Sequence, residues 1–105
     1  MARRRLSRRP SAEGLRMARL VVFDGFLDAR NDVRSERIRK NVDAMLMTIE
    51  QMPGVGSSLL PESIVAEFGT GVRKAVMSPF EIVYEYDEAT DTAYVYDLLY
   101  CPNVT

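Results

Sequence analysis

The stretch Gly71–Asp87, GVRKAVMSPFEIVYEYD, contains two strand-like runs separated by Ser78-Pro79. Val72–Met77 and Phe80–Tyr86 are rich in β-branched and aromatic residues, a composition typical of strands. In the second run the alternation places Ile82, Tyr84 and Tyr86 on one face, and Glu81, Val83 and Glu85 on the other. The pattern predicts a hairpin. It does not decide whether the hairpin only covers a core or also forms a functional surface that acts on another molecule.

Further strands are predicted on both sides of this hairpin. Thr92–Tyr100 follows the polar loop Asp87–Asp91, whose length suits a hairpin connection. In this strand the alternation sets Ala93, Val95, Asp97 and Leu99 against Tyr94, Tyr96 and Leu98. Upstream, Ile64–Phe68 and Arg19–Phe23 are also predicted as strands.

The region Val33–Met52 predicts a long amphipathic helix. Its apolar stripe has spacings of 4, 3, 4 and 3 residues and consists of Ile38, Val42, Met45, Ile49 and Met52. Pro53-Gly54 should end the helix, and Asn31-Asp32 should cap its start. Phe26–Arg30 forms either a separate helical turn or part of the same helix. A helix followed by an antiparallel sheet is an α+β pattern. The stripe either packs on this sheet or binds a partner.

Composition limits the classes of protein that fit. A chain of 105 residues with 47% hydrophobic residues suits one packed domain, expected at residues 17–105. The single cysteine, Cys101, cannot form an internal disulfide, and the chain has no histidine. We therefore expect no zinc, haem or other cofactor, and a reducing, cytoplasmic location. No apolar run reaches the roughly 18–20 residues that span a bilayer, so no membrane association is expected.

Charge is distributed unevenly along the chain. Residues 1–16 contain six arginines and one acidic residue, a net charge of +5, whereas the remaining residues contain eight basic and fourteen acidic groups, a net charge of −6. We call residues 1–16 the arm, and its arginines are suited to binding phosphate groups. Met17, however, begins a segment that resembles the natural start of a protein chain. We therefore expect residues 1–16 to be a dispensable leader. We do not expect the acidic body to bind nucleic acid directly.

The order of these motifs resembles the RelE/ParE superfamily of toxins from bacterial type II toxin–antitoxin systems. The residues that carry the resemblance are the helix end at Pro53-Gly54, the segment Gly71-Val72-Arg73-Lys74, and Pro79-Phe80 before Ile82-Val83-Tyr84-Glu85. The resemblance covers about residues 18–100. It implies helices packed on a small antiparallel sheet, inhibition by a cognate antitoxin and, for some members, plasmid stabilisation.

The superfamily has two branches, and the resemblance implies different sites for each. RelE-like members cleave messenger RNA on the ribosome, for which Arg73, Lys74, Glu81 and Tyr100 would be the catalytic candidates. ParE-like members inhibit DNA gyrase by binding it. The partner-binding candidates are Ile38, Val42, Met45, Tyr84 and Tyr86.

The acidic body and the uncharged end CPNVT favour the ParE-like reading over the nuclease, and a non-toxic binding module with the same fold is the third hypothesis. If the Arg73 face is the functional surface that the resemblance implies, Arg73 should be partly exposed beside Tyr84 or Tyr86. The simpler alternative is that Arg73 or Lys74 forms an ion pair with Glu67, Glu81 or Glu85.

Overall fold

The computed structural model describes residues 17–102, so the arginine-rich leader and the last three residues lie outside the described part. The elements in chain order are β1 (Arg19–Val22), α2 (Asp24–Asp32), α3 (Glu36–Gln51), α4 (Glu62–Phe68), β2 (Arg73–Met77), β3 (Phe80–Asp87) and β4 (Thr92–Tyr100). The strands form a sheet in the order β1-β4-β3-β2. It is antiparallel except that β1 runs parallel to β4, and the α+β fold class is confirmed.

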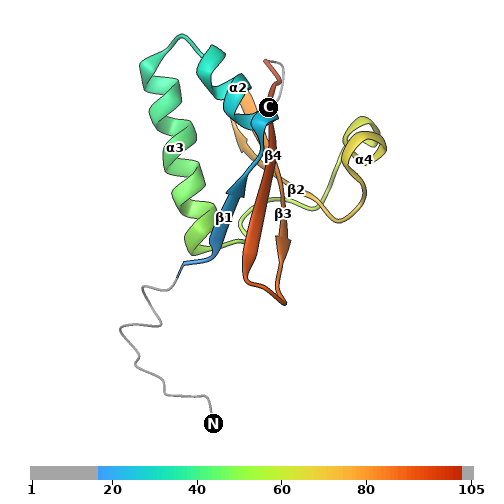
Figure 1. Cartoon of the computed structure of the whole chain (residues 1–105). Coiled ribbons are helices and arrows are strands. Elements are labelled where there is room, and N and C mark those ends of the chain that lie inside the picture. Colours follow the sequence, from blue (N-terminus) through green and yellow to red (C-terminus); the bar gives the residue numbers. More distant parts are fainter. Residues whose placement is uncertain (1–16, 103–105) are drawn as a thin grey trace.

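Helices cover both faces of the sheet (Figure 1). Helices α2 and α3 lie over one face, where the larger core includes Phe26, Val42, Ile49 and Tyr84. Helix α4 lies over the other face with a smaller cluster of Ile64, Val72 and Val83. We call these the α3 face and the α4 face. No helix in residues 17–102 is long and apolar enough to cross a membrane.

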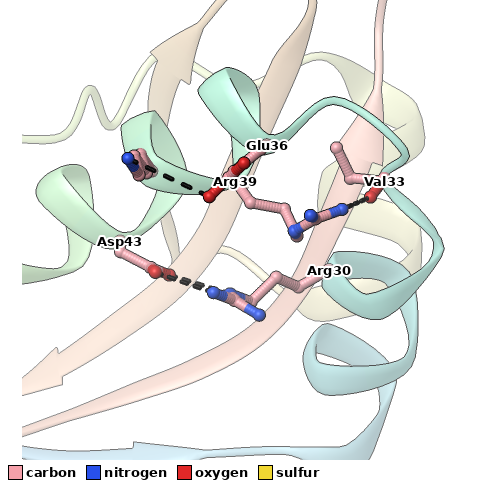
Figure 2. Close-up of polar contacts among 6 residues, drawn as sticks. Arg30, Val33, Glu36, Arg39 and Asp43 are labelled. Atoms are coloured by element: carbon pink, nitrogen blue, oxygen red, sulfur yellow. Dashed lines mark hydrogen bonds and ion pairs between the residues drawn. The ribbon is translucent and has the colours of Figure 1, made fainter.

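Helices α2 and α3 form a hairpin held by polar contacts between the two helices and at their connection (Figure 2). The guanidinium of Arg30 donates two hydrogen bonds of 2.8 and 2.7 Å to the carboxylate of Asp43. Arg39 donates to the carbonyl of Val33, which follows the last turn of α2. The segment before the long helix is thus a separate helix of nine residues rather than one turn. Both helices present their apolar sides to the sheet.

Two local predictions about the helices are wrong. Asn31-Asp32 does not cap α3 because these residues are the last of α2; the Oγ of Ser35 instead accepts the Ile38 N–H at 3.2 Å. Ile64–Phe68 lies in helix α4 and not in a strand. Pro61 starts this helix and Gly69, at φ 94°, ends it, and the spacing of four residues places Ile64 and Phe68 on one side against the sheet. These end signals outweigh the strand propensity of the short apolar run.

A β-bulge changes the predicted alternation of β4. Tyr84 of β3 is paired with Val95, whereas the preceding Val83 is paired with Asp97, so β4 has one extra residue at this point. Beyond the bulge, Leu98 joins the α3-face core, and Leu99 packs on the α4-face cluster. The prediction that Leu98 shares a face with Tyr94 and Tyr96 is therefore wrong.

Candidate functional site

A buried tyrosine holds the loop between α3 and α4 against the sheet. The hydroxyl of Tyr84 donates to the carbonyl of Pro53 at 2.7 Å and accepts the N–H of Gly56 at 2.8 Å. The contact is so close that a Cβ added at Gly56 would lie 2.7 Å from this hydroxyl. Tyr84 has no exposed surface, and burial is the main cause that raises its pKa above the ordinary value. The Pro53–Gly56 loop therefore has a fixed position beside β2.

Arg73 lies directly next to this loop. It is paired with Tyr84 across β2 and β3, so both side chains belong to the α3 face. Its Nη1 donates to the carbonyl of Gly56 at 2.7 Å, and the residue is half-buried. Within residues 17–102 it forms no ion pair with Glu85. The expectation of a partly exposed Arg73 beside Tyr84 is met, although the guanidinium also supports the loop.

Lys74 and Glu81 lie on the opposite, α4 face. Their Nζ and Oε2 atoms are 3.6 Å apart, and their side chains are 19% and 3% exposed. Burial is the main cause that raises the pKa of the Cys101 thiol, and the neighbouring Glu81 carboxylate raises it further. Because Glu81 is almost fully buried, the charge of Lys74 mainly compensates that carboxylate.

Tyr100 lies at the far end of the sheet from Arg73. It is paired with Phe80, and the two ring centroids are 5.4 Å apart. Arg73 and Met77 are the two ends of β2, and Met77 is the partner of Phe80, so the two sites are about 13 Å apart along the strand direction alone. The four nuclease candidates thus lie in three separate places, and only Lys74 and Glu81 contact each other.

The partner-binding candidates divide between core and surface. Val42 and Tyr84 have no exposed surface, so a partner cannot contact them in this conformation. Ile38 and Met45 are half-buried against the core. Tyr86 is also half-buried, and its hydroxyl donates to Asp91 at 2.7 Å. The helix stripe therefore packs mainly on its own sheet.

Sequence reasoning did not identify a polar and aromatic group on the α4 face. Tyr96 donates its hydroxyl to Oε1 of Glu85 at 2.9 Å, and burial together with this carboxylate raises its pKa to about 12. The ring of Tyr96 lies edge-on to Phe23 and stacks with Phe68. Glu85 and Tyr96 lie on different strands, so the sequence could not reveal this pair without the strand register. No group of three metal-ligating side chains was found among residues 17–102.

Comparisons with known proteins identify the fold. Neither the protein-family models nor the curated proteins gave a match. A chain of the toxin–antitoxin complex RelBE2 from Mycobacterium tuberculosis is similar with a TM-score of 0.66 at 15% identity, over 82% of this chain and 93% of that one. A chain of the intact E. coli RelBE complex gives 0.58 at 13% identity, over 77% and 93%. The isolated E. coli RelE toxin gives 0.63 at 11% identity, over 83% and 87%. The α+β architecture that the sequence resemblance implied is confirmed, and this chain has the fold of the RelE toxins.

Proposed function

We propose that this protein is the toxin of a toxin–antitoxin pair, that a cognate antitoxin holds it inactive, and that it acts by binding a cellular target, as ParE-like toxins bind DNA gyrase. Similarity to RelE toxins over most of the chain supports the toxin class. Two of the similar structures are toxin–antitoxin complexes, which supports an antitoxin partner. The target of binding is inferred from the charge and the geometry of the site.

The main observation in favour of action by binding, rather than by RNA cleavage, is that the groups suited to RNA cleavage are separated. Cleavage needs a base and an acid on either side of one phosphate, within a positive field. Here the carboxylate of Glu81 neutralises Lys74, and Tyr100 lies at the other end of the sheet from Arg73. With a body charge of −6, this arrangement favours a protein target over an RNA backbone.

A second candidate, a RelE-like ribosome-dependent nuclease, is supported by the identity of the similar structures. It would use Arg73, whose guanidinium has five N–H donors and gives only one of them to the loop. Lys74, Glu81 and Tyr100 would complete the site only after a conformational change of the sheet, or binding to the ribosome, brought them close to Arg73.

The test is growth after induction of the full chain in a bacterial host, followed by plasmid topology and transcript integrity. We expect growth arrest with loss of negative supercoiling and intact transcripts. Cleaved transcripts with normal supercoiling would establish the nuclease instead. A soluble, expressed and harmless chain would refute both readings and leave the non-toxic binding module.

Two variants separate the charge of Arg73 from its support of the loop. Arg73→Ala removes both the charge and the bond to Gly56, whereas Tyr84→Phe loosens the same loop and keeps the charge. We expect Arg73→Ala to relieve arrest and Tyr84→Phe to retain it at equal soluble level. Relief by both variants would assign the effect to the loop.

A further inference from the structure

A hollow of about 690 Å³ lies where β3 turns into β4. Its carboxylates are Glu85, Asp87 and Glu88, and its aromatic walls are Tyr86, Tyr94 and Tyr96. Arg73 also contributes to the lining, so three carboxylates face a single guanidinium group. The lining is thus net acidic, with flat aromatic rings beside the carboxylates.

The surrounding chain strengthens this negative charge. Residues 75–105 contain six acidic residues and no lysine or arginine. Asp87 accepts the Ala89 N–H, and Glu85 accepts the Tyr96 hydroxyl on one oxygen, which leaves its second oxygen available. Glu88 is exposed at the rim. These carboxylates and rings are suited to guanidinium groups, which bind carboxylates bidentately and stack on aromatic faces.

The described chain begins at Met17, at the end of the sheet where this hollow lies, and the Ala18 N–H donates to the Glu50 carbonyl of α3 at 2.8 Å. Arg19 is paired with Thr92 of β4, its N–H donates to the Asp91 carbonyl, and Thr92 is in turn paired with Asp87 of β3. Two strand spacings, about 10 Å, therefore separate the start of β1 from the hollow. Figure 1 shows the start of β1 and the β3–β4 turn at the same end of the sheet. From Met17, a segment of sixteen residues can reach about 50 Å when fully extended, which is enough to cross β1 and β4 to the hollow.

We propose that the arginine-rich segment 1–16 of this same chain docks in the hollow, with its guanidinium groups on Glu85 and Glu88 and over the tyrosine rings. The segment has six arginines and a net charge of +5, against a body charge of −6. Tethering at β1 keeps it at a high effective concentration, so weak individual ion pairs suffice. Residues 1–16 then have a specific role, in contrast to the dispensable leader expected from the sequence.

The experiment compares NMR spectra of the full chain with a variant in which the arm arginines are neutralised. The substitutions are Arg3→Gln, Arg4→Gln, Arg5→Gln, Arg8→Gln, Arg9→Gln and Arg16→Gln. We expect amide shifts to change at Glu85, Glu88 and Tyr94 and to stay constant in α4. A synthetic peptide of residues 1–16, added to the neutralised chain at a concentration of about 1 mM to replace the effective concentration of the tether, should restore the original shifts, and 0.5 M salt should abolish its effect.

A matched pair of variants tests the site itself. In the neutralised chain, Glu85→Gln with Glu88→Gln should weaken peptide binding about fivefold, while Asp28→Asn with Asp32→Asn, which removes two exposed charges from α2, should leave it unchanged. Unchanged shifts at the hollow, peptide shifts that map to another surface, or equal binding by both variants would each overturn the proposal.

Discussion

Removing a single oxygen atom, in Tyr84→Phe, should destabilise the protein strongly. The hydroxyl makes hydrogen bonds of 2.7 Å to the Pro53 carbonyl and 2.8 Å from the Gly56 N–H, in a side chain with no exposed surface. Each bond contributes about 0.5–1.5 kcal/mol net, and a buried group left without a partner costs about 1–3 kcal/mol. We therefore expect a loss of about 2–4 kcal/mol in the free energy of unfolding. Since 1 kcal/mol shifts the Tm of a small domain by about 4–8 °C, the midpoint should fall by about 15 °C.

Urea unfolding followed by circular dichroism measures this loss, with Tyr100→Phe as the control. Tyr100 is 67% exposed and keeps its ring contact with Phe80 after the change, so we expect a loss below about 0.5 kcal/mol. Hydrogen exchange at the Gly56 amide should also accelerate in Tyr84→Phe. A variant as stable as the wild type to within about 0.5 kcal/mol would refute the reasoning that this hydroxyl is the main support of the loop.

Two pH-dependent predictions follow from the other polar contacts. The pKa of Tyr96 is raised to about 12, so the folded state retains this proton above the ordinary value of about 10 and stability is lost as pH rises through that window. Since burial also raises the pKa of Tyr84, an ultraviolet titration should show two tyrosines ionising late, and Glu85→Gln should lower the pKa of Tyr96 alone; ordinary titration of all five tyrosines would contradict this. The bonds from Arg30 lower the pKa of Asp43, so their contribution is present above about pH 4 and is lost as the carboxylate is protonated. Asp43→Asn should cost about 0.5–1 kcal/mol at pH 7 and nothing at pH 2, measured by denaturant unfolding, with Lys40→Gln in the exposed 4.0 Å pair as a neutral control. A loss that persisted at pH 2 would show that packing, and not the ion pair, is responsible.

Local patterns predicted most of the fold because the long elements carry strong periodicity. Most of the α3 stripe packs on the core, although Met52 follows the helix and is 56% exposed, and the alternation of β3 places Ile82 and Tyr84 on one face and Val83 on the other. Helix α4 was assigned wrongly because its central residues, Ile64 and Val65, are β-branched and the element has only seven residues. Its end signals, Pro61 and Gly69, were present in the sequence and were the better guide. The bulge in β4 depends on packing against both sheet faces, and no local signal marks it.

The candidate site was predictable only in part, since its contacts join distant parts of the chain. Lys74 with Glu81 follows from the hairpin register, and Glu81 was among the partners considered from the sequence. The bond from Arg73 to Gly56 spans 17 residues and depends on where Tyr84 holds the loop. Side-chain type alone therefore suggested a functional arginine, and it could not indicate the structural role of the same group.

This double role affects how mutations of the basic residues can be interpreted. Removal of Lys74 leaves the Glu81 carboxylate, 3% exposed, without its cation, which is costly in a buried site. Loss of toxicity in such a variant would therefore report on the fold as much as on chemistry. Arg73 differs because it is half-buried and its loop has a second support in Tyr84. Since loop stability can be varied at Tyr84 without any change of charge, Arg73 is the position at which function and fold can be separated.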